Sequence, residues 1–424
     1  MNDSNFRKAA LTMLHQDKSG RPIEVAAIMW LLISATTFLC EQTRAEDDGV
    51  LPGIDVLQRH EFAELAGKQV GLITNHTGRS RDGVSTVQLL HDAPNVNLVA
   101  LFSPEHGFEG KLDVSKINDA TEQSTGLRIF SLYGETRRPT KELLDGLDVL
   151  VFDIQDIGCR FYTYVSTMGE AMKASAQHNV TFMVLDRPNP IGGRDVAGPM
   201  LDPGRESFVG FHSLPVRHGM TVGELAAMFR SELKLDLDLQ VVRCEGWKRS
   251  RFWDDTGLLW VNPSPNMRSL TQALLYPGIG VIEFTNVSVG RGTDTPFEVI
   301  GAPWITARDF AAALNRNRPE GVSFVPIKFT PDASKFKGER CGGVNIVVTN
   351  RTTFEPLRTG FLIAATLRQL YPHEWEADKM LRLLGNESTL KAITDGNTPA
   401  EIEHVAEHGM AQFRDRRAGF LMYE

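Results

Sequence analysis

Four short apolar runs in this sequence each lead into side chains that can do chemistry. The run at residues 98–102 is followed by Ser103, Pro104, Glu105 and His106. The runs at 70–74, 149–152 and 182–185 lead into the sequences NHTG, DIQDIG and DRPNP. Carboxyl and imidazole groups can give and take protons, so these positions are candidates for general acid–base chemistry.

The apolar runs have the length and composition of buried β-strands. Helical patterns follow them at residues 84–92, 140–147 and 164–178, and this alternation predicts a parallel sheet. We therefore expect an α/β fold with a Rossmann-like sheet covered by helices on both faces. Ligands of such sheets bind beyond the carboxyl ends of the strands. Any one of these polar segments could be an ordinary turn, since such residues are common in turns. Four such segments at the same edge of the sheet favour a functional site there.

The length of 424 residues and the 42% hydrophobic content fit a globular protein of about two domains. We predict a catalytic domain at 46–301 and a smaller C-terminal α/β domain at 302–424. Thr221 and Glu224 form a capping box before a helix at 225–233, and long polar loops occupy 191–220, 263–267 and 285–293. Further expected elements are a strand near 241–242, helices at 306–315, 361–370 and 400–413, and strands at 322–329 and 344–348.

The first 45 residues differ from the rest of the chain. Basic residues precede an apolar run at 25–40, a pattern typical of a secretory signal, with cleavage expected near Ala45. We therefore expect an exported, periplasmic or secreted protein, with an uncleaved membrane anchor as the alternative. The net charge of −8 argues against a nucleic-acid partner. Three widely spaced cysteines remain, with no disulfide or zinc pattern: Cys159, Cys244 and Cys341.

Several long motifs resemble one family, the exo-β-N-acetylmuramidases, which are glycoside hydrolases long catalogued as a domain of unknown function. They are GLITNHTG, LFSPEHGFEG, SLYGETRRPT, LDVLVFDIQDIGCRFYTYVSTM, LDRPNPIGG, VRHGMTVGELA, PSPNM and TNVSVGRGTDTPFEVIGAPW. The resemblance implies release of terminal β-linked N-acetylmuramic acid from the non-reducing end of peptidoglycan fragments. It also implies a cleft between a Rossmann-like domain and a smaller one. Cys159 and the Arg268–Ser269 pair depart from the family pattern. No dinucleotide fingerprint is present, so no cofactor is expected.

Glycoside hydrolysis generally uses two carboxyl groups. Glu105 is our predicted acid, because it follows an apolar strand and stands in the most recognisable motif of the family. His106 is a candidate hydrogen-bond partner. We favour Asp153 as the second carboxylate, with participation of the substrate's own acetamido group as an alternative. Other acids are candidates for the second carboxylate or for sugar contacts: Asp156, Asp186 and Glu298.

Muramic acid carries a lactyl carboxylate, which a guanidinium can bind in a bidentate manner. Arg160 and Arg291 are the preferred candidates, because neighbouring glycines permit close approach. Tyr162 and Tyr164 are candidates for stacking on a sugar or donating a hydroxyl. Further candidates for contacts with sugar hydroxyls and acetamido groups are Asn75, Asn189, His218, Asn266 and Asn286.

Two other classes of protein remain open at this point. One is a metal-dependent hydrolase of wall peptides or esters, with ligands from His76, His106, Asp153, Asp156, Asp186 and His218. No compact metal-ligand spacing supports it, so no metal is expected. The other is a non-catalytic module that binds wall sugars, which needs the arginines, tyrosines and amides but no buried acid.

Overall fold

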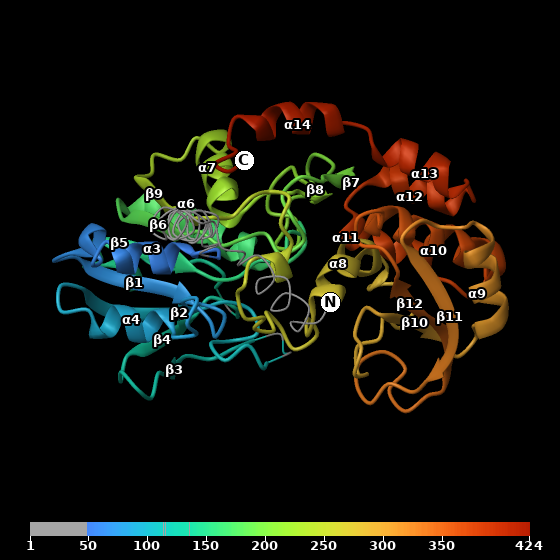
Figure 1. The fold of residues 1–424 in the computed structure, drawn as a ribbon, viewed down its shortest axis with the longest axis horizontal. Coiled ribbons are helices and arrows are strands. Elements are labelled where there is room, and N and C mark those ends of the chain that lie inside the picture. Colours follow the sequence, from blue (N-terminus) through green and yellow to red (C-terminus); the bar gives the residue numbers. More distant parts are fainter. Residues whose placement is uncertain (1–48, 113, 115, 135) are drawn as a thin grey trace, which may run out of the picture. The chain divides into compact units, whose positions relative to one another are not determined.

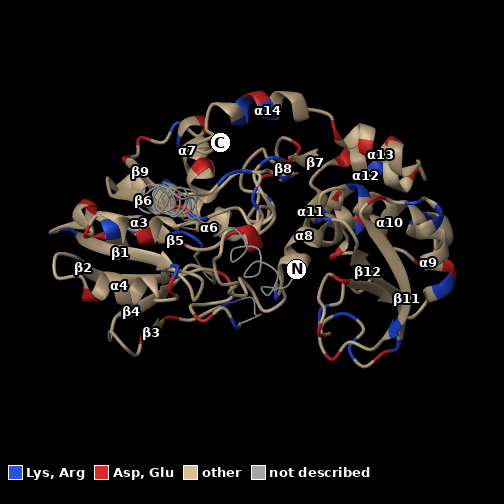
Figure 2. Cartoon of the chain, viewed as in Figure 1, with Lys and Arg blue, Asp and Glu red and all other residues tan. Residues whose placement is uncertain are grey.

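The computed structural model describes residues 49–112, 114, 116–134 and 136–424, and residues from Gly49 onward form one compact unit. The predicted leader at 1–45 lies outside the described residues. Among those residues, no helix has the length and apolar character needed to cross a bilayer. Figure 2 shows acidic and basic residues interspersed over the elements.

A seven-stranded sheet in the order β3-β4-β2-β1-β5-β6-β9 carries the N-terminal half (Figure 1). All neighbours in it are parallel except the edge pair β3 and β4. The central strands are almost wholly buried, which is why they are near-continuous runs of Val, Leu, Ile and Phe. The strands are β1 (Gln69–Thr74), β2 (Asn97–Ser103), β3 (Ala120–Thr121), β4 (Arg128–Ser131), β5 (Val149–Asp153), β6 (Thr181–Leu185) and β9 (Leu239–Val242).

Helices cover both faces of this sheet, which confirms the predicted fold class. Val149 and Val151 pack on one face with apolar residues of α3 (Gly53–Arg59) and α4 (Thr86–Asp92). Leu150 and Phe152, which point the other way along the strand, pack with α5 (Lys141–Leu144), α6 (Tyr164–His178) and α7 (Val222–Glu232). The predicted capping box of Thr221 and Glu224 is formed at the start of α7.

The C-terminal half contains a three-stranded antiparallel sheet in the order β10-β12-β11. Its strands are β10 (Val299–Ala302), β11 (Val322–Phe329) and β12 (Cys341–Val348). The helices are α8 (Leu270–Ile279), α9 (Ala307–Arg316), α10 (Pro356–Leu370), α11 (Leu381–Leu384), α12 (Glu387–Thr394), α13 (Pro399–Ala406) and α14 (Met410–Ala418). One hydrophobic cluster joins this half to the α6 face of the large sheet, and the predicted domain boundary near Ala302 stays a prediction.

Two local predictions need correction. The terminal helix predicted at 400–413 is two helices, because Gly409 adopts a left-handed φ of 82° before α14. The loop predicted at 191–220 contains a two-stranded antiparallel sheet of β7 (Ala197–Met200) and β8 (Pro215–Arg217). Four short 3-10 helices complete the described elements: η1 (Ala63–Leu65), η2 (Trp253–Asp255), η3 (Gly280–Ile282) and η4 (Ala377–Met380).

Candidate active site at the carboxyl edge of the sheet

The register of the central strands places three polar segments at one edge. Ile73 of β1 lies opposite Phe102 of β2, and Thr74 lies opposite Asp153 of β5. The residues that follow β1, β2 and β5 therefore leave the sheet side by side. This is the edge at which parallel sheets bind ligands.

Glu105 lies in a tight turn directly after β2. The carbonyl of Pro104 accepts a hydrogen bond from the amide of Gly107 at 3.1 Å, and His106 adopts a left-handed φ of 69°. The carboxyl of Glu105 is half-buried and accepts a hydrogen bond from the hydroxyl of Thr163. Thr163 is the N-cap residue of α6, so the start of this helix fixes the position of the acid.

His106 contacts the loop that follows Glu105. Its Nδ1 lies 2.7 Å from the carbonyl oxygen of Leu112, a contact that closes the loop after Glu105. The described contacts therefore give His106 the role of holding the loop that carries the acid.

Three buried tyrosines surround the Glu105 side of the edge. The hydroxyl of Tyr164 donates to the carbonyl of Pro263 at 2.5 Å. Tyr162 packs edge-on against both Tyr164 and Tyr276, with ring centroids 5.0 and 6.0 Å apart. Burial raises the pKa of the Tyr164 hydroxyl, and the negative charge of Glu105 raises it further. The tyrosines are therefore neutral hydroxyl groups that can bind an uncharged sugar.

Two of the predicted amides, Asn75 and Asn266, lie near these tyrosines. Asn75 contacts Tyr164, and Asn266 contacts Arg291. Asn75, at the end of β1, accepts from the amide and hydroxyl of Thr77 at 2.9 and 2.6 Å, and its side chain lies beside the Tyr164 hydroxyl. Asn266 accepts from Nε and Nη2 of Arg291 at 3.2 and 3.1 Å when its amide is oriented to satisfy both groups. Both amides are therefore held by protein partners at the edge of the cluster.

Arg291 lies in the same cluster, paired with an acid that the sequence did not single out. Its guanidinium donates to the carboxylate of Glu283. Burial raises the pKa of the Tyr276 hydroxyl, and charges on Glu283, Arg291 and Glu105 act on the same hydroxyl. The cluster thus joins one half-buried acid, neutral hydroxyls and one guanidinium from both halves of the chain.

Asp156 and His218 form a buried polar pair beneath this edge. Nε2 of His218 lies 3.8 Å from Oδ2 of Asp156, while Nδ1 accepts from the amide of Met220 at 3.2 Å. Burial raises the pKa of Asp156 to about 7 and lowers the pKa of His218 to about 3. A neutral imidazole that accepts at Nδ1 carries its proton on Nε2, facing the acid. The charge of Asp156 also acts on the Tyr162 and Tyr164 hydroxyls, so the pair lies near the tyrosine cluster.

Asp153 does not have the environment predicted for a second catalytic carboxylate. It is fully buried, accepts from Nε and Nη2 of Arg187 at 2.5 and 2.9 Å, and accepts a third hydrogen bond from Thr86. A carboxylate that is engaged by three protein donors has little capacity left for a substrate. These contacts support the strand ends, and the catalytic role of Asp153 stays a prediction.

Asp186 is likewise a structural acid. It accepts from the hydroxyls of Thr221 and Tyr423 at 2.7 and 2.5 Å and from the amides of Gly223 and Arg187 at 2.8 and 2.9 Å. Burial raises its pKa to about 6. Its location at the start of α7 explains the carboxylate, because helix N-termini bind anions.

Arg160, the other predicted lactyl ligand, is wholly buried. Its two terminal nitrogens donate to the carbonyls of Pro199, Leu214, Leu383 and Leu384 at 2.7–3.0 Å. The last two carbonyls end α11, so Arg160 caps that helix. Burial lowers its pKa to about 10. These contacts join the two halves of the chain, and the role of Arg160 as a ligand of the lactyl group stays a prediction.

Three further candidates bind the protein itself. Asn189 donates to the carbonyl of Met220 at 3.0 Å, and Asn286 donates to the carbonyl of Glu374 at 2.6 Å. Glu298 accepts from the side chain of Gln272 at 3.0 Å. These contacts hold loops and helix ends, and the predicted sugar contacts of all three residues stay predictions.

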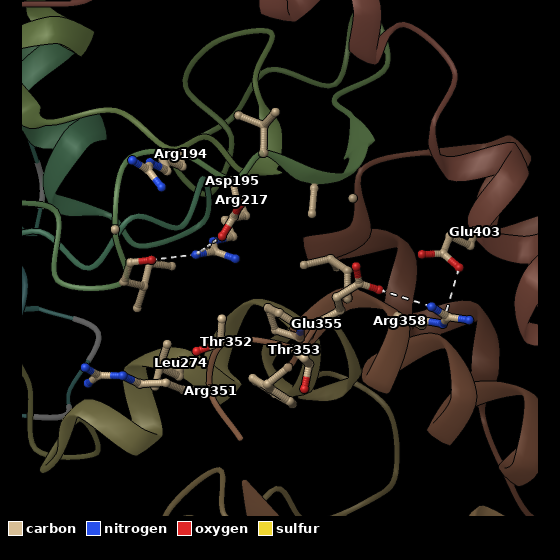
Figure 3. A pocket seen from close by; sticks show the side chains of 18 of the residues that line it. Arg194, Asp195, Arg217, Leu274, Arg351, Thr352, Thr353, Glu355, Arg358 and Glu403 are labelled. Carbon is tan, nitrogen blue, oxygen red and sulfur yellow. Dashed lines mark hydrogen bonds and ion pairs between the residues drawn. The ribbon is translucent and has the colours of Figure 1, made fainter. Parts of the chain in front are cut away.

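Two cavities lie near or beyond this edge. A hollow of about 630 Å³ is lined by His76 and by residues 109–111, 259–262, 264 and 265, of which Ser264 lies beside the Tyr162 hydroxyl. A larger cavity of about 700 Å³ contains none of the predicted site residues. Figure 3 shows ionic contacts inside this cavity: Arg217 contacts Asp195, and Arg358 contacts both Glu355 and Glu403. The Glu105 cluster, and not the larger cavity, is therefore our candidate active site.

In the described part of the chain, no group of three or more His, Cys, Asp or Glu side chains is placed to hold a metal ion. His76 binds the carbonyl of Asn262 through Nε2 at 2.7 Å. His106, Asp153, Asp186 and His218 have the separate partners described above.

Sequence reasoning missed four side chains of the cluster: Thr163, Ser264, Tyr276 and Glu283. Thr163 lies in the motif GCRFYTYVSTM and Ser264 in PSPNM, where other residues drew attention. Tyr276 and Glu283 are single polar residues in otherwise apolar segments, LLYPGIGVIEF. A lone acid in such a segment was the signal that was overlooked.

The chain is an α/β protein in which a half-buried acid and neutral tyrosine hydroxyls lie together at the carboxyl edge of a parallel sheet. Two family models match the chain, "Exo-beta-N-acetylmuramidase NamZ, N-terminal" over residues 70–271 and "Exo-beta-N-acetylmuramidase NamZ, C-terminal" over residues 274–423. The chain therefore belongs to the exo-β-N-acetylmuramidase NamZ family, which confirms the resemblance noted from its motifs.

Known relatives agree with this assignment. The peptidoglycan β-N-acetylmuramidase NamZ of Bacillus subtilis (strain 168) is 43% identical over 383 residues, covering 89% of this chain and 92% of the relative. Two crystal structures of DUF1343 family proteins from Bacteroides fragilis NCTC 9343 are also similar. One has a TM-score of 0.83 at 38% identity and the other 0.73 at 30%, each covering 88% of this chain and 99% of the other.

Proposed function

We propose that the protein is an exo-acting glycosidase that releases terminal β-linked N-acetylmuramic acid from the non-reducing end of peptidoglycan fragments during cell-wall turnover. The observation that carries the proposal is the half-buried carboxyl of Glu105, fixed by Thr163 and facing neutral tyrosines. Membership of the family and the name of the Bacillus subtilis relative give the sugar and the exo mode.

In this proposal Glu105 is the proton donor to the glycosidic oxygen. The neutral hydroxyls of Tyr162 and Tyr276 bind sugar oxygens without competing for the proton, while the Tyr164 hydroxyl is held by the carbonyl of Pro263. Asp153 is occupied by Arg187, so the second role falls to another group. Two acids are candidates for this second role, Asp156 and Glu283, because their charges act on the same tyrosines. The third candidate is the acetamido group of the substrate.

A direct test uses two short glycans that differ only in their non-reducing end. The protein should release free N-acetylmuramic acid from a fragment that ends in that sugar. It should leave the fragment intact when N-acetylglucosamine caps the same end. Release of internal fragments from both glycans, measured by mass spectrometry, would contradict an exo mode.

Arg291 is the proposed reader of the lactyl carboxylate. Replacing it by Ala should weaken binding of N-acetylmuramic acid by about 10–100-fold, as expected for one charge-assisted hydrogen bond of roughly 1.5–3 kcal/mol. Binding of N-acetylglucosamine, which lacks the carboxylate, should change little. Isothermal titration with both sugars measures the difference.

The pairing of Arg291 with Glu283 supplies a control. Glu283→Gln removes the internal anion that competes for the guanidinium, so it should bind N-acetylmuramic acid at least as tightly as the unaltered protein. Equal losses for both sugars in Arg291→Ala would assign the lactyl group to another residue.

Export is part of the same proposal, because the basic and apolar pattern of residues 1–45 is that of a secretory signal. In the native host we expect the mature protein in the periplasmic or secreted fraction, with its N-terminus near residue 46. Cell fractionation and N-terminal sequencing test this. Cytoplasmic protein with an intact leader would overturn it.

A further inference from the structure

The cavity of about 700 Å³ shares no lining residue with the Glu105 cluster. Its walls come from the β7–β8 hairpin, from residues 351–358 at the start of α10, and from adjacent parts of α13 and α14. Helix α8 contributes to both places from different sides, because Leu274 lines the cavity and Tyr276 belongs to the tyrosine cluster. Sites for small ligands usually have volumes of about 300–1,000 Å³. The proposed glycosidase activity leaves a cavity of this size without a role.

The side of the cavity formed by the β7–β8 hairpin and α14 is rich in arginine. The guanidinium groups that line it are those of Arg194, Arg217, Arg249 and Arg414. Burial lowers the pKa of the neighbouring Arg417 to about 10, and the charges of Arg249 and Arg414 lower it further, partly offset by two nearby carboxylates. Positive charges therefore crowd this side, and a crowd of like charges attracts an anionic group of a ligand.

Arg217 is the buried member of this side that keeps donors for a ligand. Only 5% of the residue is exposed. Its Nη2 donates to the carbonyl of Ile191 and lies 3.2 Å from the carboxylate of Asp195, whose own side chain is largely exposed. Its Nε has no hydrogen-bond partner among the described residues. A buried guanidinium with an exposed counter-ion and an unused N–H is suited to bind a further carboxylate.

The side formed by the start of α10 and by α13 is acidic. The guanidinium of Arg358 lies 3.4 Å from the carboxylate of Glu355 and 3.7 Å from that of Glu403. Burial raises the pKa of Glu403, and the charges of Glu355 and Glu407 raise it further, against the opposing effect of Arg358. Figure 3 shows Arg358, Glu355 and Glu403 across the cavity from Arg194 and Arg217. Carboxylates exceed cations in this group, so this side attracts an ammonium group.

The rest of the lining adds little further charge. Arg351 contacts the carboxylates of Asp254 and Asp255 at 2.5 and 3.2 Å, so its guanidinium is already matched by acids. Apolar side chains supply much of the remaining wall: Val196, Leu274, Phe354, Leu357 and Phe361. A doubly anionic ligand would be repelled by the acidic side, and a neutral ligand would leave both sides without partners. The lining therefore fits a ligand that carries one charge of each sign and an apolar portion.

We propose that this cavity is a second binding site, which takes a short peptide with a free carboxylate and a free ammonium group. The carboxylate binds at Arg194 and Arg217, and the ammonium group binds at Glu403 and Glu407. A single amino acid carries both charges but fills only a small part of the cavity. An extended tripeptide, about 10 Å long, suits the volume better. The inference does not depend on the proposed function, because the two sites share no residue.

The test is isothermal titration of the full-length protein with three probes: trialanine, N-acetyl-trialanine and trialanine amide. The acetyl cap removes the ammonium group, and the amide removes the carboxylate. Free trialanine should bind about 10–100-fold more tightly than either capped form, because each cap deletes one charge-assisted contact. Equal affinities for the three probes, or no binding of free trialanine at millimolar concentration, would overturn the proposal. Tightest binding of N-acetyl-trialanine would also overturn it, in favour of a plain anion site.

Variants on the two sides should affect the two preferences separately. Arg217→Gln and Arg194→Gln should each reduce the preference for free trialanine over its amide, and Glu407→Gln should reduce the preference over the acetylated form. Arg194 and Glu407 are exposed, so their variants keep the test valid if Arg217→Gln does not fold. Arg205→Gln is the control, because Arg205 lies between β7 and β8 but pairs with Glu387 outside the cavity. Both preferences should persist in this control. Unchanged preferences in Arg194→Gln and Glu407→Gln would overturn the assignment.

Discussion

Replacing Glu105 by Gln should lower turnover of an unactivated muramyl disaccharide by about 10²–10⁴-fold, the usual contribution of a general acid. The amide keeps the size of the side chain and its hydrogen bond with Thr163, but it has no proton to give. The loss should be smaller for a nitrophenyl muramide, because nitrophenolate leaves with little protonation. Steady-state kinetics on the two substrates measures this difference.

Binding of N-acetylmuramic acid should change little in Glu105→Gln, which separates loss of chemistry from loss of the site. Glu206→Gln is the control, because Glu206 is exposed and lies in the segment between β7 and β8. Near-normal turnover of the disaccharide by Glu105→Gln would mean that another group is the acid. Equal losses on both substrates would point to misplacement of the sugar.

The position of Glu105 could be predicted because it depends on local sequence. An apolar run, a proline that ends it and the turn that follows are all contained in residues 98–107, and strand ends obey local rules. The same reasoning identified α6 with its observed bounds and the capping box of α7. The family motifs then gave the chemistry of the edge.

The roles of Arg160, Asp186 and Asn286 could not be predicted, because their partners are far away in the sequence. Arg160 binds carbonyls at Leu383 and Leu384, and Asp186 accepts from Tyr423. Nothing in the segment around a buried polar residue shows which distant carbonyl or hydroxyl will satisfy it, yet burial requires that some group does. Sequence reasoning could therefore not find these internal contacts.

The need of buried polar groups for hydrogen-bond partners also explains why few groups remain for the substrate. Of the acids that follow the strands, Asp153 and Asp186 are consumed by internal donors. Glu105, whose described hydrogen bond comes from a single hydroxyl, retains capacity for a ligand. A polar edge is thus divided into groups that hold the fold and groups that can react, and hydrogen-bond saturation distinguishes them.

The buried pair of Asp153 and Arg187 should dominate the stability of this edge. Arg187→Met leaves the Asp153 carboxylate buried without its cation, and Asp153→Leu leaves the guanidinium without its anion. Each single variant should lower the free energy of unfolding by about 3–5 kcal/mol, the usual cost of stranding a buried charge. Urea unfolding followed by tryptophan fluorescence measures the loss.

The double variant Asp153→Leu/Arg187→Met decides between a structural and a catalytic Asp153. Replacing both partners of a buried ion pair by apolar groups is often neutral or stabilising, so the double variant should recover most of the stability that each single change removes. If Asp153 only supports the strand ends, the refolded double variant should also keep turnover within about tenfold of the unaltered protein, since a tenfold change corresponds to about 1.4 kcal/mol of misplacement at the site. A stable double variant that has lost the 10²-fold or more expected of a missing catalytic group would return Asp153 to the chemistry. Because stability and turnover are measured on the same protein, loss of fold cannot be mistaken for loss of a catalytic carboxylate.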